Sequence, residues 1–184
     1  MELYDYEKKH IELLRKAACE CMVLLKSDGT FPLEKACEVA LYGSGARKTI
    51  KGGTGSGDVN VRHYVTIEEG LKNAGFQITT SDWMDEYEVK YKDARKLFVK
   101  EIKQDADKKG MPAFLLGMGA VMPEPEYELP IQKDGDLAIY VLSRISGEGS
   151  DRKPIAGDLK LTRTEVRDIL YLNEHFQKFM LVLN

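Results

Sequence analysis

The chain has 184 residues, of which 43% are hydrophobic and 31% charged, so it can bury a sizeable core and is not a disordered segment. Its 27 Lys and Arg against 30 Asp and Glu give a formal net charge of −3, which argues against nucleic-acid binding through bulk positive charge. No apolar stretch approaches the ~18 residues of a membrane helix, and the charged N-terminus lacks the apolar region of a signal peptide. We therefore expect a cytoplasmic protein with no membrane or nucleic-acid partner.

The cysteines and histidines offer no metal site or disulfide framework. Cys19, Cys21 and Cys37 are odd in number and form no Cys-x-x-Cys pair, which is typical of reduced cysteines. None of the three histidines stands at metal-ligand spacing from another histidine or a cysteine. We expect neither a metal nor another cofactor.

The first predicted element is a leading helix within residues 1–26. Its apolar residues recur at steps of three and four, and the turn residues Ser27, Asp28 and Gly29 follow it. Residues 37–43 then read as a strand with a continuous apolar stretch, which suits a parallel sheet covered on both faces. A glycine-dense loop follows over residues 43–57.

Two helices and a strand are predicted next. Thr66 with Glu69 forms a capping-box pattern at the start of a helix that ends at Gly75, and residues 76–80 read as a second strand. From Trp83 onward, aromatic and apolar residues recur at helical spacing for about twenty residues between charged ones. We interpret these aromatics as packing residues rather than as a cofactor site.

The last third contains the strongest strand, over residues 136–143. Before it, residues 110–135 read as an irregular insertion in which residues 113–116 suit a short strand. A polar loop covers residues 146–158, and Thr162 with Glu165 repeats the capping-box pattern. We expect this last helix to bury Val166, Ile169, Leu170 and Phe176, and a final apolar strand over residues 179–183.

Strands that alternate with helices predict an α/β fold, a three-layer α/β/α sandwich with a mostly parallel sheet and right-handed crossovers. We expect one domain over residues 1–184, incomplete at its C-terminus, because the sequence ends directly after a strand that reads as buried. An incomplete sheet exposes an apolar edge or face, which favours association into homo-oligomers.

Three glycine-containing segments are candidate binding loops. Gly43-Ser44-Gly45 follows a strand, but a dinucleotide fingerprint needs a third glycine or alanine where Lys48 stands, so nucleotide binding is a weak alternative. Residues 51–58 hold four glycines in six residues, which allows Ser56 and several N–H groups to meet a polar ligand; a flexible surface loop fits this pattern equally well.

The third segment, residues 146–152, follows the strongest strand, at the end of a parallel strand where open α/β sheets place ligands. Glu148 stands between glycines, so its carboxyl group is little shielded by its neighbours in sequence. Asp151 and Arg152 are expected to pair and fix the loop. A solvated loop carboxylate is the alternative interpretation of Glu148.

Taken together, the segments resemble the α/β sandwich domain of glycoside hydrolase family 3, the β-glucosidase family. The resemblance begins near Arg15 and runs to Asn184, and it rests on an ordered succession of motifs. These are VLLKSDGTFPL at 23–33, VALYG at 39–43, KGGTGSG at 51–57, TIEEGL at 66–71 and ISGEGSDR at 145–152.

The resemblance implies a retaining mechanism with two carboxyl groups, in which an aspartate attacks the anomeric carbon and a glutamic acid protonates the leaving oxygen. It assigns the acid/base role to Glu148 and sugar binding to Ser56, with Thr54 and Gly55 beside it. The nucleophile belongs to a (β/α)8 barrel domain that this sequence lacks. Residues 81–83 spell the Ser-Asp-Trp of the nucleophile motif, but lie in the wrong domain, so we read them as coincidence.

We therefore expect a piece of an enzyme in which the sandwich domain precedes the barrel. This piece supplies the acid/base residue for hydrolysis of terminal β-linked glucose and is inactive by itself. The main alternative is a non-catalytic α/β binding or interaction domain that keeps only the scaffold.

Overall fold

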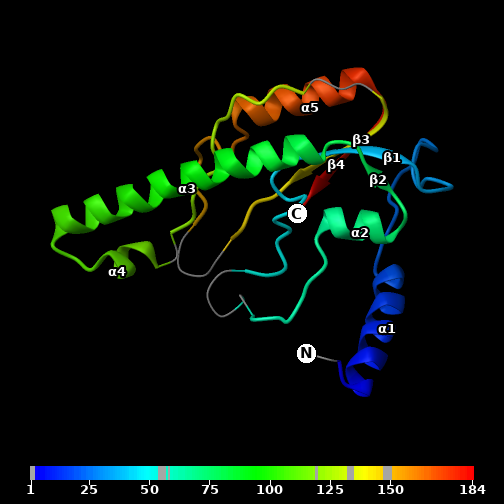
Figure 1. Ribbon diagram of the computed structural model, residues 1–184, viewed down its shortest axis with the longest axis horizontal. Helices are drawn as coiled ribbons and strands as arrows, with labels where there is room; N and C mark the ends of the chain where they lie inside the picture. Colours follow the sequence, from blue (N-terminus) through cyan, green and yellow to red (C-terminus); the bar gives the residue numbers. More distant parts are fainter. Residues whose placement is uncertain (1–2, 54–56, 58, 119, 132–134, 147–150) are drawn as a thin grey trace. The chain divides into compact units, whose positions relative to one another are not determined.

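The computed structural model describes residues 3–53, 57, 59–118, 120–131, 135–146 and 151–184 (Figure 1). The chain divides into two compact units, Met1–Glu34 and Lys35–Asn184. In the part of the chain that the structure describes, no helix is long and apolar enough to cross a membrane.

The first unit consists of helix α1, Asp5–Glu20, and an extended segment. The Tyr4 backbone N–H, at the N-cap, donates to the Glu7 carboxylate at 2.7 Å. The helix ends six residues before the position predicted from the apolar spacing. Residues 22–25 are four apolar residues in a row, a pattern that suits an extended segment as well as a helix.

The second unit is built on a four-stranded sheet in the order β2-β1-β3-β4, in which every pairing is parallel. The strands are β1, Glu38–Tyr42; β2, Gln77–Ile78; β3, Gly135–Leu142; and β4, Phe176–Leu183. All four were predicted, although β4 begins three residues earlier than expected and β2 is only two residues long. The central strands β1 and β3 supply most of the fully buried apolar side chains.

Three helices connect these strands and cover both faces of the sheet. They are α2, Ile67–Asn73; α3, Ser81–Lys109; and α5, Arg163–His175. The crossover through α2 runs in the opposite direction along the sheet from those through α3 and α5, so right-handed crossovers place α2 on one face and α3 with α5 on the other. Figure 1 shows this arrangement. The predicted three-layer α/β/α sandwich is confirmed.

The predicted helix starts are also correct. The Thr162 side chain accepts from the Glu165 N–H at 3.0 Å and the Glu165 carboxylate accepts from the Thr162 N–H at 2.8 Å, a complete capping box. Thr66 accepts from the Glu69 N–H at 3.1 Å, whereas the Glu69 carboxylate contacts His63 instead.

Aromatic side chains from α3 fill the space above the sheet, as their spacing predicts. Trp83 stacks on Tyr87 with ring centroids 5.6 Å apart and meets Tyr42 of β1 edge-on at 5.0 Å. Tyr127, from the segment before β3, packs edge-on against Tyr87 at 5.3 Å. These rings form the core between α3 and the sheet.

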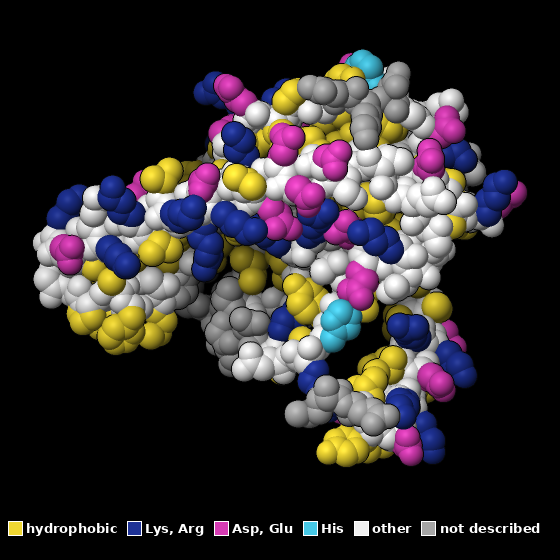
Figure 2. Space-filling view, viewed as in Figure 1, with side chains coloured by type: hydrophobic (Ala, Val, Ile, Leu, Met, Phe, Trp, Pro, Cys, Tyr) yellow, Lys and Arg dark blue, Asp and Glu magenta, His cyan; other side chains and the backbone are white. Residues whose placement is uncertain are grey.

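The prediction of a short strand at residues 113–116 is wrong. This segment forms helix α4, Ala113–Gly117, which packs against the far end of α3, where Gly117 approaches Ile102. A strand needs a neighbour to pair with, and none of the described strands lies at that end of α3 (Figure 1). Exposed apolar side chains gather there, visible as the yellow cluster below the tip of α3 in Figure 2: Met111, Phe114, Leu115 and Met118.

The predicted buried face of α5 is only partly correct. Phe176, directly after the helix, is buried, but Val166 and Leu170 are 41% and 56% exposed. The face that packs inward carries Glu165, Asp168 and Leu172 instead. Apolar periodicity missed this face because two of its members are carboxylates that find buried partners in the fold.

Candidate functional site

The carboxyl ends of β1, β3 and β4 lie together at one edge of the sheet. The Gly45 N–H donates to the Val141 carbonyl at 3.1 Å, and a Cβ atom at Gly45 would collide with the Ser143 side chain. Gly43 has φ +93° and an added Cβ there would meet the backbone of Val141. The glycines of this turn therefore allow close approach to β3, which explains them without a nucleotide.

Asn184 connects the start of the second glycine-rich loop to this edge. Its side-chain oxygen accepts from the Ile50 N–H at 2.7 Å and from the Ser143 hydroxyl at 2.8 Å, while its amide donates to the Ile50 carbonyl at 3.1 Å. Thr49 continues the connection, since its hydroxyl donates to the Gly45 carbonyl and accepts from the Ile67 N–H at the start of α2.

The two loops singled out in the sequence come together here. A Cβ atom placed on Gly53 would lie 3.3 Å from the carbonyl oxygen of Ser146. Gly53 directly precedes the residues proposed to bind sugar, and Ser146 stands two residues before Glu148. Segments nearly a hundred residues apart in sequence thus meet at one place on the sheet edge.

The loop after β3 is closed by Arg152, but not through the expected partner. The Arg152 Nε donates to Asp158, six residues later, and its Nη1 donates to the Ile145 carbonyl. Asp151 is exposed and makes no ion pair with Arg152, so the predicted pairing of these neighbours is wrong. Adjacent side chains diverge, whereas the turn over residues 155–160 brings Asp158 back to the guanidinium.

A second arginine anchors the same segment to helix α5. Arg144 donates from Nη2 to the Glu165 carboxylate at 2.6 Å and from Nε to the Asp158 carbonyl at 2.9 Å. Glu165 is 1% exposed, so this ion pair is buried on its acidic side. Hydrogen bonds at both ends of the guanidinium fix the strand end relative to the helix.

A cavity of about 200 Å³ opens between these loops and α3. The charged or polar side chains among those lining it are Ser44, Lys48, Glu124, Ser143, Arg144, Arg152 and Asp158. The Tyr87 hydroxyl donates to the Glu124 carboxylate at 2.6 Å. Within the described part of the chain, the Lys48 Nζ has no hydrogen-bond acceptor and lies over the ring of Tyr91, 2.9 Å from its centroid.

Glu124 and Lys48 both change charge near neutral pH. Burial raises the pKa of Glu124 to about 7, even though the hydrogen bond from Tyr87 favours the ionised form. Burial also lowers the pKa of Lys48 to about 8, although Glu88 and Glu124 favour its charged form. The cavity is therefore lined by two groups whose pKa values lie close to neutral pH.

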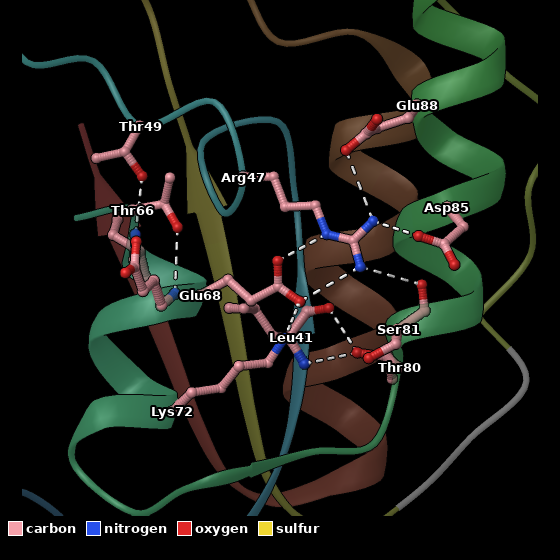
Figure 3. A network of polar contacts seen from close by, with 12 residues as sticks. Leu41, Arg47, Thr49, Thr66, Glu68, Lys72, Thr80, Ser81, Asp85 and Glu88 are labelled. Atoms are coloured by element: carbon pink, nitrogen blue, oxygen red, sulfur yellow. Dashed lines mark hydrogen bonds and ion pairs between the residues drawn. The ribbon is translucent and has the colours of Figure 1, made fainter. Parts of the chain in front are cut away.

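On the other side of β1, Arg47 joins helices α2 and α3 (Figure 3). Its Nε donates to the Glu68 carboxylate at 2.7 Å, and its Nη1 pairs with Asp85 and lies 3.6 Å from Glu88. Lys72 also donates to Glu68, at 2.9 Å. This network is structural, since it holds α2 and α3 together at the end of β1.

The residues predicted to act on the substrate, Thr54, Gly55, Ser56 and Glu148, lie outside the described residues. The structure does place the segments next to them, through the Gly53 to Ser146 approach. Sequence reasoning missed Asp158, Glu124 and Asn184. Asp158 lies in a segment that the sequence marks only as a polar loop. Glu124 lies between prolines in a segment without a recognisable pattern. Neither residue therefore stood out as functional from its neighbours in sequence.

The chain matches the Glycosyl hydrolase family 3 C-terminal domain over residues 22–184. It belongs to this family. The described fold agrees, because the beta-glucosidase 3B of Thermotoga neapolitana, solved in complex with glycerol, superposes with a TM-score of 0.62 at 30% identity. That comparison covers 96% of this chain and 24% of the Thermotoga protein.

Two curated relatives are similar over nearly the whole chain. The Beta-glucosidase A of Butyrivibrio fibrisolvens is 33% identical over 96% of this chain, and the Beta-glucosidase of Ruminococcus albus is 30% identical over 94%. This chain spans 22% and 18% of their respective lengths, about a fifth in each case. It thus corresponds to one part of these larger proteins.

Proposed function

We propose that this chain is the sandwich-domain part of a retaining β-glucosidase and supplies its general acid/base, Glu148. The observation that carries the proposal is the meeting of the two loops, with Gly53 against Ser146 at the carboxyl edge of the sheet. A glycosidase needs its proton donor beside the sugar that it cleaves. Attachment of both loops to the ends of β3 and β4 supports such a juxtaposition of Glu148 with Ser56.

The chemistry divides between two domains. A companion (β/α)8 barrel supplies the aspartate that attacks the anomeric carbon and forms the glycosyl-enzyme. Glu148 protonates the departing glycosidic oxygen and then removes a proton from the water that hydrolyses the intermediate. Retention requires the two carboxyl groups to be ~5–5.5 Å apart, which only the assembled domains achieve. The substrate class is a glycoside or oligosaccharide with a terminal β-linked glucose.

The isolated chain should be catalytically silent. It carries neither the barrel nucleophile nor the partner surface that would desolvate Glu148 and keep it protonated. Purified chain should therefore leave an aryl β-glucoside intact. Hydrolysis by the wild-type chain that disappears in Glu148→Gln would contradict this division of labour.

The decisive experiment uses a hybrid enzyme in which this chain replaces the matching segment of the Butyrivibrio fibrisolvens Beta-glucosidase A. The hybrid should hydrolyse aryl β-glucosides with retained configuration. Glu148→Ala should lower kcat/KM for poor leaving groups by roughly a hundredfold or more, and added azide should restore turnover of an activated substrate by forming β-glucosyl azide.

Glu128→Gln, an exposed glutamate on the segment before β3, is the matched control and should behave as wild type. A folded hybrid that binds glucose without turnover would favour the non-catalytic binding domain instead. An active hybrid unaffected by Glu148→Ala would refute the assigned acid/base.

A further inference from the structure

All three oxygens of Asp158 accept hydrogen bonds from residues in the segment that follows β3. One carboxylate oxygen accepts from the Arg152 Nε and the other from the Lys153 N–H at 2.8 Å, while its backbone carbonyl accepts from the Arg144 Nε at 2.9 Å. The side chain is 14% exposed. The Lys153 N–H, and then Arg152, hold the pKa of Asp158 below its usual value, so it stays an anion at neutral pH.

Arg152, which Asp158 holds, spans the two ends of the preceding loop. While its Nε is bound to Asp158, its Nη1 donates to the Ile145 carbonyl. The first residue of the ISGEGSDR motif is thereby joined to its last residue. A planar guanidinium offers donors in a fixed fork, so fixing one side with Asp158 also fixes the direction of the other.

The support under Asp158 is itself rigid. The neighbouring Gly157 has φ +79°, and its carbonyl accepts from the Glu124 N–H at 2.8 Å. A Cβ atom on Gly157 would collide with the Glu124 backbone, so the two segments touch directly. Asp158 is therefore held in place, and it can position a side chain on the loop of residues 146–152.

We propose that Asp158 is a positioning residue for the acid/base glutamate, acting through Arg152 on both ends of the loop that carries Glu148. This inference rests on the proposed function for its catalytic consequence. A proton donor displaced by about 1 Å loses roughly a hundredfold in rate. Asp158→Asn keeps the shape of the side chain but removes the charge that holds Arg152.

The test separates positioning from stability through the leaving group. In the hybrid enzyme, Asp158→Asn should lower kcat/KM roughly tenfold or more for an alkyl β-glucoside, whose departure needs a proton, and less than about threefold for an activated aryl β-glucoside. Asp136→Asn, an exposed aspartate at the opposite end of β3, should change neither. Equal losses on both substrates would mean a merely structural role and would overturn the proposal.

Two further measurements distinguish the role of Asp158 from that of Asp151 and from the proposed function itself. In the isolated chain, Asp158→Asn should speed amide hydrogen exchange roughly tenfold at Lys153, whose N–H donates to the Asp158 carboxylate, and unchanged exchange would also overturn the proposal. If Asp151→Asn reproduced the effects and Asp158→Asn did not, the positioning residue would be Asp151. If Glu148→Ala were harmless, the proposed function would fail, whereas a damaged Glu148→Ala with a normal Asp158→Asn would reject only the role of Asp158.

Discussion

The Arg144 guanidinium lies 2.6 Å from the carboxylate of Glu165, which is 1% exposed at the start of α5. Breaking a buried ion pair leaves an uncompensated charge that costs more than the intact pair contributes. Arg144→Met should therefore lower the free energy of unfolding by about 3–5 kcal/mol in urea titrations. Arg163→Met, an exposed arginine on the same helix, should stay within about 0.5 kcal/mol of wild type.

Because of Glu124, the free energy of unfolding should fall as the pH rises. Its pKa goes from 4.5 to about 7 on folding, so between these values the unfolded chain releases a proton that the folded chain keeps. This group's contribution should decline through that window, by on the order of 3 kcal/mol in all. Glu124→Gln keeps an acceptor for Tyr87 but does not titrate, so it should remove the decline.

The measurement is urea unfolding of both chains at closely spaced pH values from 4 to 8. Glu128→Gln, which is exposed on the same segment, should leave the pH profile unchanged. Parallel profiles for wild type and Glu124→Gln would show that Glu124 ionises normally in the folded state.

Asn184 should stabilise the start of the glycine-rich loop. Asn184→Ala removes three hydrogen bonds to Ile50 and Ser143. Each contributes about 1 kcal/mol, so we expect a loss of roughly 3 kcal/mol and faster hydrogen exchange at the Ile50 amide. Asn60→Ala, in an exposed part of the following loop, is the control. An unprotected Ile50 amide in the wild-type chain would contradict the prediction.

The Arg47 network predicts an acid-sensitive contribution. Burial opposes ionisation of Glu68, but hydrogen bonds from Arg47 and Lys72 outweigh it and hold its pKa below the usual 4.5. The resulting stability is present above the unfolded pKa and is lost as the pH falls through the folded pKa. Arg47→Met should cost about 2–3 kcal/mol at pH 7, and its difference from wild type should shrink below about pH 4.

Lys72→Met offers a graded comparison, because Lys72 meets the same carboxylate but is 53% exposed. Exposed ion pairs contribute at most about 1 kcal/mol, so this variant should be the milder one. Equal losses from the two substitutions would mean that the partial burial of Arg47 has no energetic consequence.

Local sequence patterns predicted most of the fold because the interactions behind each pattern form between residues that are close together in the sequence. The apolar run of β3 and the Thr162–Glu165 capping box are complete within a few residues, and both were predicted correctly. The inward face of α5 was not predicted, because the charge of the buried Glu165 is balanced by Arg144, which is distant in sequence. The predicted partner of Arg152 was wrong for the same reason, since its actual partner, Asp158, is brought close by the turn around Gly157.

Because β3 pairs with β1 on one side and with β4 on the other, the loop that follows it leaves the sheet from an interior strand. Its two ends are joined directly, because the Arg152 guanidinium donates to the Ile145 carbonyl. Residues 147–150 should thus be exchangeable for those of another family 3 protein without refolding the sheet. Transplanting these four residues would change the loop while the scaffold is retained.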